Sequence, residues 1–403
     1  MIRHLVKLIW NRKRASALVV VEIFASFLVL VAVATLALYV ATNRNRPLGF
    51  RWDGVLSVLA VHPGQPRQLG EETTAAEEET AERLYREIAA LPGVVAVGAA
   101  EVAPYQIGGS QNNFGLHGRK IESDVNDVTP GIRDALRLDL VAGRWFTAAD
   151  RDLPYSPLVI NQALAREAFG AGSPLGQVLL TPDPEDHQPE GRVVGVISDF
   201  RIRGELSGPG NYLFRLHRPG QPPARFLSCL FVRLRPGASA ELERVVAERL
   251  RAVAPGWNFT VTPLSRERAG AFRRVLAPLA AAVLVAFFLL AMVGLGLLGV
   301  LWQNLLRRTK EIGLRRAAGA TRASIHRQLV MEQLLLTTLG VLCGLVLVLQ
   351  LPLFGVTGWL GPGVFAGGVV VALAAIYLLA TLSALYPSLL AGRVEPALAL
   401  RDE

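Results

Sequence analysis

Residues 303–332 read QNLLRRTKEIGLRRAAGATRASIHRQLVME, and this stretch lies between two long apolar segments. Its charged side chains are almost all basic, with Glu311 as the acidic exception before Glu332. The basic residues are Arg307, Arg308, Lys310, Arg315, Arg316, Arg322 and Arg327. A short basic loop between two membrane spans faces the cytoplasm under the positive-inside rule. The charge alone fits a basic anchor for lipid headgroups equally well.

The order of residues inside this loop predicts more than an anchor. Gly319 tolerates the left-handed backbone conformation that often ends a helix. Thr321 can then cap a second helix that continues into the next span. The loop would then contain a rigid helix–glycine–helix structure on the cytoplasmic face.

The composition of the 403 residues is typical of a membrane protein, with 51% apolar and 19% charged side chains. A formal net charge of +9 could indicate nucleic-acid binding. The basic residues flank apolar segments, however, so membrane topology explains the charge and we expect no nucleic-acid partner. Cys229 is expected in a soluble strand and Cys343 in a membrane segment, so a disulfide between them is not expected.

The N-terminal region predicts a surface helix followed by a span. Residues 1–14 have one apolar face and a basic face, which suits a helix lying in the inner headgroup layer. Residues 15–41 are long enough to cross the membrane, and too long for the apolar part of a cleaved signal peptide. Glu22 lies inside this span. It is a possible functional carboxylate, or it pairs with an arginine of a neighbouring helix or reaches back to the interface.

Three further spans are predicted at residues 275–302, 329–353 and 364–386, and residues 387–403 form a tail. The stretch 303–328 is the cytoplasmic loop between the second and third spans. An even number of spans places both termini in the cytoplasm. The predicted fold class is therefore a four-helix membrane protein with a large α+β domain between helices 1 and 2.

That domain, residues 42–274, has an ordinary soluble composition. Thr74 and Glu77 have capping-box spacing at the start of a predicted helix, and strands are predicted on either side. A second strand–helix–strand unit follows after residue 226. We predict a split α+β part at 50–103 and 206–265, with an inserted subdomain at 104–205 that is rich in turns and short strands. Asn161 is predicted to cap a short helix in the insertion.

Catalytic motifs are not found in the sequence. It lacks the phosphate-binding G-x-x-x-x-G-K-[ST], the zinc motif H-E-x-x-H and the nucleophile motif G-x-S-x-G. His187 lies among acidic residues in a proline-rich loop, which is typical of a solvated loop rather than a metal site. We therefore expect no catalytic, cofactor or metal residues, and any energy source must come from another chain.

Several short strings occur in a set order along the chain. In the membrane part these are RTKEIGLRRAAGAT (308–321), QLVME (328–332), YP (386–387) and VEPALALR (394–401). In the predicted soluble domain they are PG (130–131), AGRWF (142–146), VINQALA (159–165) and VVGV (193–196). By the order of these strings, and over essentially its whole length, the chain resembles the permeases of the MacB/FtsX-type ABC transporter superfamily, which includes MacB, the LolC/LolE lipoprotein extractors and FtsX.

This resemblance implies a multi-pass protein of the inner membrane with a periplasmic domain. The permease would pair with a second copy or a related chain and bind a dimer of cytoplasmic ATPase subunits, which hold ATP and Mg²⁺. Loop 303–328 would dock the ATPase through Arg315, Arg316, Gly319, Ala320, Thr321, Ser324, Ile325 and Arg327. Membrane lipids, a periplasmic adaptor and an outer-membrane duct are further implied partners.

The implied mechanism is mechanotransmission, in which ATP-driven movement of the cytoplasmic loops is passed through the spans to the periplasmic domain. Export of an amphipathic compound or peptide is the favoured activity. Lipoprotein extraction, control of cell-wall hydrolases, and a receptor or scaffold without transport are the alternatives. Residues 388–390 (Ser-Leu-Leu) stand where the family often has more basic residues, which suggests a divergent subfamily and leaves the cargo open. Glu22 is a further departure, because the first span of the family is otherwise usually small and apolar. MacB itself carries an ATPase domain before its first span, so a separately encoded ATPase is expected here.

Overall fold

The computed structural model describes residues 13–61, 74–106, 110–116, 119–180, 190–218, 228–237, 240–307, 314, 321–355, 357–358 and 360–391. The chain divides into two compact units. Asn43–Val275 is called the soluble unit; Met1–Thr42 with Leu276–Glu403 is called the membrane unit. Four helices are long and apolar enough to cross a membrane, and an α+β domain lies between the first two, so the predicted fold class is confirmed. The predicted surface helix and tail lie almost wholly outside the described residues.

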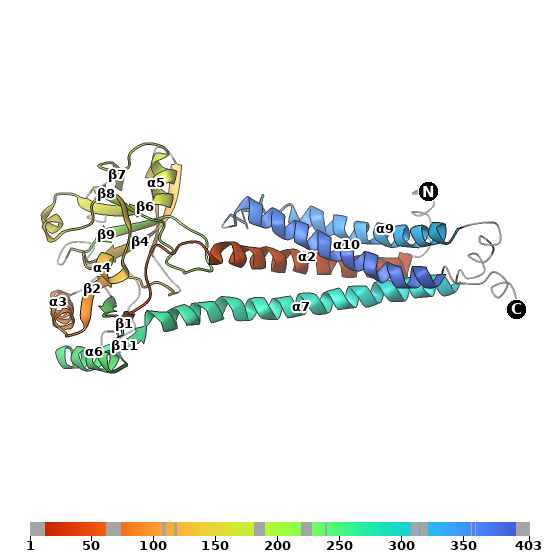
Figure 1. Cartoon of the computed structure of the whole chain (residues 1–403). Coiled ribbons are helices and arrows are strands. Elements are labelled where there is room, and N and C mark those ends of the chain that lie inside the picture. The colour runs from red at the N-terminus through yellow and green to blue at the C-terminus, as the bar shows by residue number, and fades with distance from the viewer. Residues whose placement is uncertain are drawn as a thin grey trace. The chain divides into compact units, whose positions relative to one another are not determined.

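The soluble unit is built on one mixed sheet (Figure 1). Its strands are β1 (Val55–Val61), β2 (Val94–Ala100), β3 (Ser110–Leu116), β4 (Arg119–Val128), β5 (Leu140–Gly143), β6 (Ser156–Asn161), β7 (Val178–Leu180), β8 (Gly191–Ile197), β9 (Tyr212–Leu216), β10 (Cys229–Leu234) and β11 (Asn258–Pro263). The order across the sheet is β11-β1-β10-β2-β4-β9-β6-β8-β5, with β3 beside β4 and β7 beside β8. Strands distant in sequence therefore become neighbours.

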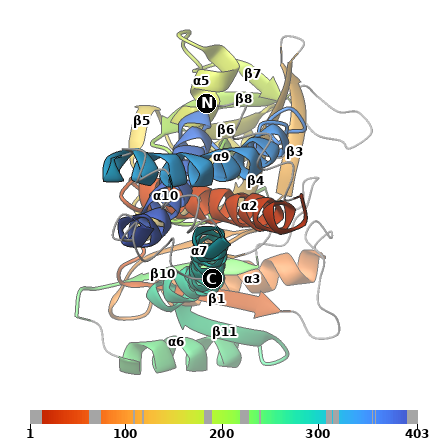
Figure 2. The ribbon, with the colours of Figure 1, turned by 90° about the vertical axis from the view of Figure 1, so that its right-hand side faces the viewer.

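One half of the sheet is the antiparallel set β11-β1-β10-β2. Helices α3 (Ala75–Ala89) and α6 (Ala240–Val253) lie at this end of the sheet in both views (Figures 1 and 2). The predicted capping box of α3 is confirmed: the Thr74 amide donates to Glu77 Oε2 at 2.8 Å, and the Glu77 amide donates to Thr74 Oγ1. This cap satisfies backbone donors that a helix start leaves unpaired.

The other half contains β4, β9, β6 and β8, where parallel and antiparallel pairs alternate. Helix α5 (Gln162–Phe169) lies at this end, and the predicted cap is confirmed because Asn161 Oδ1 accepts from the Leu164 amide at 3.0 Å. The predicted inserted subdomain ended at residue 205. Strand β9 nevertheless pairs with β4 and β6, so the insertion continues through residue 216. Strand pairing, which sequence spacing does not reveal, places this boundary.

The two halves of the sheet join through a narrow seam. Strands β2 and β4 share a single residue pair, Ala100 and Val128. Asn126 strengthens this seam, since its Oδ1 accepts from the amides of Glu101 and Val102 at 3.1 Å and its Nδ2 donates to Tyr212 at 2.9 Å. Beside it, the buried Arg215 of β9 pairs with Asp127 of β4 at 2.6 Å.

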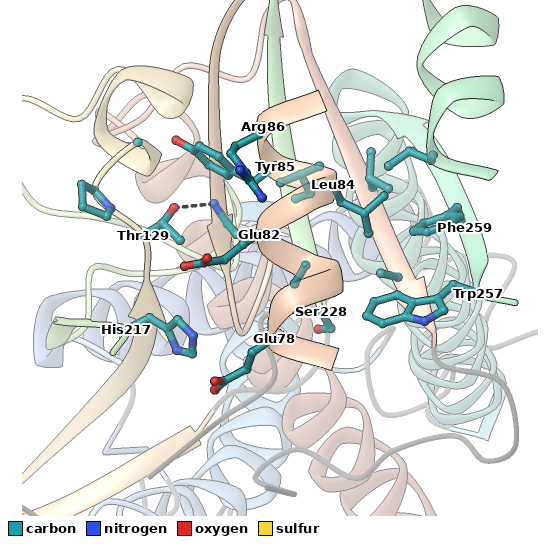
Figure 3. Close-up of a pocket in the computed structure, with 18 of the residues that line it drawn as sticks. Glu78, Glu82, Leu84, Tyr85, Arg86, Thr129, His217, Ser228, Trp257 and Phe259 are labelled. Atoms are coloured by element: carbon teal, nitrogen blue, oxygen red, sulfur yellow. Dashed lines mark hydrogen bonds between the residues drawn. The ribbon is translucent and has the colours of Figure 1, made fainter. Parts of the chain in front are cut away.

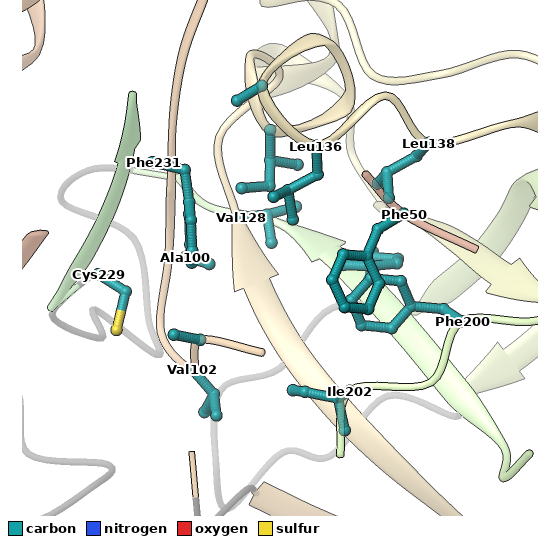
Figure 4. Close-up of a cluster of buried hydrophobic side chains, with 14 of the residues drawn as sticks. Phe50, Ala100, Val102, Val128, Leu136, Leu138, Phe200, Ile202, Cys229 and Phe231 are labelled. Atoms are coloured by element: carbon teal, nitrogen blue, oxygen red, sulfur yellow. The ribbon is translucent and has the colours of Figure 1, made fainter. Parts of the chain in front are cut away.

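A large apolar core lies on the sheet face opposite α3 (Figure 4). It combines Phe231 of β10 and Val128 of β4 with helix α4 (Ile132–Leu136) and with Phe50 and Phe200. The two phenyl rings lie 5.3 Å apart. Alternate residues of each strand face this core, as the period of a strand requires. Because the core draws on both halves, it holds the seam closed.

The membrane unit contains α2 (Lys13–Arg44), α7 (Leu264–Arg307), α9 (Arg322–Val348) and α10 (Pro362–Ala391), the first two of which begin or end in the soluble unit. Helix α7 was predicted from residue 275 but begins eleven residues earlier. Its first turns carry several charged residues, and only their structure shows that they continue the helix.

Glycines allow the other helices to approach α2 closely. A Cβ on Gly340 of α9 would lie 2.8 Å from Ile23, and one on Gly344 would lie 2.5 Å from Phe27. Gly368 of α10 is in equally close contact with Thr35. Small residues permit such backbone approach where packing, rather than water exclusion, holds helices together. Helix α2 therefore has α9 and α10 packed closely against it in the membrane unit.

Candidate functional site

The predicted ATPase-coupling residues divide into two groups. Arg315, Arg316, Gly319 and Ala320 lie outside the described residues. The remaining four lie at the start of α9, where Thr321 caps the helix as predicted and Oγ1 accepts from the Ser324 amide at 3.3 Å. Thr321, Ser324 and Arg327 are exposed, whereas Ile325 is 6% exposed. The first three side chains are thus available to a partner, and Ile325 packs within the unit.

Glu22 is half-buried on α2 and faces α7. A Cβ on Gly296 of α7 would lie 2.8 Å from Glu22 Oε2, so this glycine makes room for the carboxylate. Among the described residues, no cation lies within ion-pair distance of Glu22, and the arginine partner considered from the sequence is not found there. The acidic side chain therefore lies at the α2–α7 contact, against a position with no side chain of its own.

A third set of residues forms what we call the junction, where the soluble unit holds both of its connections to the membrane helices. Arg201 is 2% exposed, and its guanidinium donates to several backbone carbonyls. Its guanidinium donates to Asn43 O in the last turn of α2 at 3.0 Å and to Arg46 O just after α2 at 2.8 Å. It also donates to the carbonyls of Glu205 and Ser207. Arg201 thus fastens its own loop to the end of α2.

The same loop holds the first turns of α7. Arg268 Nε donates to Glu205 Oε1, and Glu205 is 7% exposed. The Arg268 guanidinium lies over the rings of Trp52 and Phe272, at 4.6 Å and 4.8 Å from their centroids. A cation over an aromatic face is attracted by the ring quadrupole. Loop 201–207 therefore contacts the segment after α2 through Arg201 and α7 through Glu205.

Tyr105 closes the junction in an uncommon backbone conformation. Its φ is +69°, a value that only a few per cent of non-glycine residues adopt. Its ring covers Gly204, where a Cβ would lie 2.4 Å from Cε1, so position 204 requires glycine. Its carbonyl accepts from Arg274 of α7 at 2.5 Å. Burial, followed by the nearby Glu205 carboxylate, raises the pKa of the Tyr105 hydroxyl, which stays protonated and donates to Glu205 at 3.4 Å.

Sequence reasoning missed the junction. Arg201 and Asn43 are 158 residues apart, and no spacing rule connects them. Arg268 and Arg274 appear in the sequence as basic residues before a span, on the side that the predicted topology makes periplasmic, where the positive-inside rule does not account for them. The sequence feature that could have predicted the junction is the group of charged residues just before the second span. Arginines close to Trp and Phe in the sequence are not required by a solvated linker.

Two family profiles match the chain. Residues 25–249 match the MacB-like periplasmic core domain. Residues 283–396 match the FtsX-like permease C-terminal region. Together they account for the soluble unit and the later spans.

Similar proteins include a macrolide export ATP-binding/permease protein MacB of Bdellovibrio bacteriovorus, 25% identical over 76% of this chain and 48% of the relative. An uncharacterised ABC transporter permease of Bacillus subtilis, YknZ, is 24% identical over 57% of each chain. The solved periplasmic region of MacB from Actinobacillus actinomycetemcomitans aligns with a TM-score of 0.39 and 14% identity, over 57% of this chain and 97% of that one. The chain spans about half the length of these curated relatives.

Proposed function

Because the chain belongs to the family of MacB/FtsX-type ABC transporter permeases, we propose that it is the membrane-spanning subunit of an ABC transporter that works by mechanotransmission. The family and the four apolar helices make it a multi-pass membrane protein with a periplasmic domain. ATP and Mg²⁺ are bound by a dimer of separate cytoplasmic ATPase subunits. Two permeases, identical or related, complete the transporter in the inner membrane, with both termini in the cytoplasm.

The observation that carries this proposal is the junction. One loop of the soluble unit, residues 201–207, binds the end of α2 through Arg201 and the first turns of α7 through Glu205. A displacement of α7 relative to α2 would strain this loop before it strained any other part of the soluble unit. Pro278 lies inside α7, just beyond the boundary between the units, and removes one helical hydrogen bond there. The helix is therefore easiest to bend next to the junction.

The proposed cargo is an amphipathic compound or peptide that the periplasmic domain expels, in cooperation with an adaptor and an outer-membrane duct. The names of the relatives support an export role, since several are export ATP-binding/permease proteins. The exposed Thr321, Ser324 and Arg327 at the start of α9 are the described residues that we assign to ATPase docking.

Arg268→Met tests the junction, because methionine keeps an apolar stem but removes the charge that binds Glu205. Arg266→Met is the matched control, since Arg266 is exposed on the same turn of α7. We expect cells with the permease and its ATPase to lose resistance to the macrolide erythromycin with Arg268→Met and to keep it with Arg266→Met. ATP hydrolysis by the purified complex should persist in both. Unchanged resistance with Arg268→Met would show that the junction transmits nothing.

Docking is tested separately by Ser324→Glu with Arg327→Glu, which reverses the local charge without touching the buried Ile325. We expect this double variant to lose co-purification with the ATPase. Arg244→Glu, on the exposed surface of α6, is the control and should retain it. A double variant that still binds the ATPase would move the docking site elsewhere. If the wild-type complex confers no macrolide resistance but releases lipoproteins from membranes, extraction replaces export as the activity.

A further inference from the structure

A cavity of about 350 Å³ lies beneath α3 in the soluble unit (Figure 3). Its floor is the sheet face formed by β1, β10 and β11, and α3 is its roof. Ligand pockets of proteins range from about 300 to 1,000 Å³. The described residues that line this cavity all belong to the soluble unit, and none of them takes part in the junction.

The cavity exists because small side chains occupy positions between helix and sheet where larger apolar side chains would normally pack. Leu84 and Ile88 cover the sheet near the end of α3, with 5% and 0% exposure. One turn earlier on the same face, the residue is Ala81. Opposite it, the floor carries Ala60 and Ser228, whose strands are joined by a hydrogen bond from the Ala60 amide to Ser228 O at 2.8 Å. Protein interiors are normally packed to the density of organic crystals, so this volume is a built feature of the sequence.

The two ends of the cavity differ in chemistry. Trp257 and Phe259 lie at one end, with their rings stacked at 6.3 Å and an interplanar angle of 22° (Figure 3). His217 and Glu82 lie at the other end. Glu82 pairs with Arg151 at 3.6 Å. Both of these side chains remain about half-exposed, so they mark the solvent side.

Among the described lining residues, the charges at the polar end are balanced, because Glu78 and Glu82 are matched by Arg86 and Arg151. Burial lowers the pKa of His217, which is therefore neutral at neutral pH and both donates and accepts hydrogen bonds. The Arg151 Nε is buried and has no acceptor among the described residues. An uncharged ligand group that accepts a hydrogen bond suits this end better than an ion of either sign.

We propose that this cavity binds a small, uncharged amphipathic molecule, whose apolar body lies against Trp257 and Phe259 and whose hydroxyl or amide group lies beside His217. Binding itself is independent of transport. The identification of such a molecule as cargo rests on the proposed function, because an expelled compound must first be captured by the periplasmic domain.

The test is photolabelling of the full chain in lipid nanodiscs, without ATPase or ATP. The probe is a benzyl alcohol that carries a photoactivatable trifluoromethyl diazirine on its ring, and mass spectrometry maps the labelled peptides. We expect saturable labelling of peptides that contain Ala81, Ser228 or Trp257. The corresponding benzylamine and benzoate probes, which carry charges of opposite sign, should label these peptides more weakly than the alcohol.

Two variants fill the cavity from opposite sides. Ala81→Leu fills it from α3 and Ala60→Ile from β1, and each should lower labelling about tenfold or more by occupying the space of the ligand. Ala89→Leu is the matched control, since Ala89 is exposed on the same helix. Labelling that survives both filling variants, or equal labelling by all three probes, would overturn the proposal. Loss of labelling with erythromycin export intact would remove the cargo role and leave the proposed function standing.

Discussion

The two ends of the soluble sheet are both covered by helix, but they are packed in opposite ways. We call α5 with β4, β6, β8 and β9 the filled end, and α3 with β1, β2, β10 and β11 the hollow end. At the filled end Leu158, Ile160 and Leu164 have no exposed surface. At the hollow end Ala81 and Ala60 leave a cavity of about 350 Å³. A helix that covers a sheet therefore leaves a cavity unless large side chains fill the space between the two. We infer that the filled end supplies stability and that the hollow end gives some of it up for a binding space.

The largest effect should come from the buried ion pair of the filled end. Asp127→Ala removes the carboxylate that pairs with the charged Arg215, at a position where both side chains are at most 6% exposed. Breaking such a pair from one side costs about 3–5 kcal/mol. Pulse proteolysis in urea, on the full chain in nanodiscs, measures the loss. Glu241→Ala breaks an exposed pair with Arg244 and should cost less than about 1 kcal/mol. If Asp127→Ala and Glu241→Ala lose equal free energy of unfolding, the buried pair is not a major source of stability.

A matched pair of substitutions compares the ends directly. Ala168→Leu inserts a large side chain beneath α5, where Ala168 is 3% exposed, and overpacking of this kind costs about 1–3 kcal/mol. Ala81→Leu inserts the same group beneath α3, where space exists, and should cost less than about 1 kcal/mol. The same proteolysis measures both. If Ala81→Leu proves as costly as Ala168→Leu, the hollow end is filled in solution.

The cap of α3 sharpens the comparison on a smaller scale. Thr74→Ala removes the acceptor for the Glu77 amide and the reciprocal bond to Glu77, at a cost of about 1 kcal/mol. Hydrogen exchange should quicken at the first amides of α3 and stay unchanged in α5. Glu79→Ala, an exposed change in the same turn, is the control. Slow exchange at the start of α3 in Thr74→Ala would mean that the roof is held by other contacts.

The last comparison is a pH dependence of stability at the polar end of the cavity, which is absent at neutral pH. Burial lowers the pKa of His217 in the folded state, so the unfolded chain takes up its proton first, near pH 6.5. His217 contributes stability above the unfolded pKa, and this contribution falls as the pH drops towards the folded pKa, by at most about 1.4 kcal/mol per pH unit. His217→Gln should flatten the change in stability between pH 7 and 5. An unaltered slope in that variant would exclude His217 as its source.

Local patterns in the sequence predicted a large part of the fold. The apolar spans, the capping box of Thr74 and Glu77, and the caps by Asn161 and Thr321 depend on residues a few positions apart. The placement of β9 in the inserted part depends instead on strand pairing across the chain. Sequence periodicity does not show which strands pair. The end of the inserted part could therefore not be predicted.

The candidate sites were less predictable than the fold. The junction depends on Arg201 meeting carbonyls in a segment 158 residues away, and arginine at such a position has no sequence signature. The cavity depends on small residues from α3, from β1 and from the position just before β10. Alanine and serine are common in helices and strands, so their coincidence is visible only once the strands are paired. Glu22 was conspicuous in the sequence, but its neighbour Gly296 was not.

The seam between the halves of the sheet has a consequence for how this architecture can vary. The chain passes from β2 into the insertion beside Glu101 and returns from it at Ser228, whose hydroxyl donates to Glu101 O at 3.1 Å. The two ends of the insertion therefore lie side by side, at the ends of strands β2 and β10, which pair along most of their length. Apart from Tyr105 and loop 201–207, which form the junction, the residues between these strands can change in number and shape without shifting the register of the strands around them, as tolerated domain insertions require of their insertion points. We expect relatives of this chain to differ most in the residues inserted between β2 and β10 outside the junction, and least in strands β1, β2, β10 and β11.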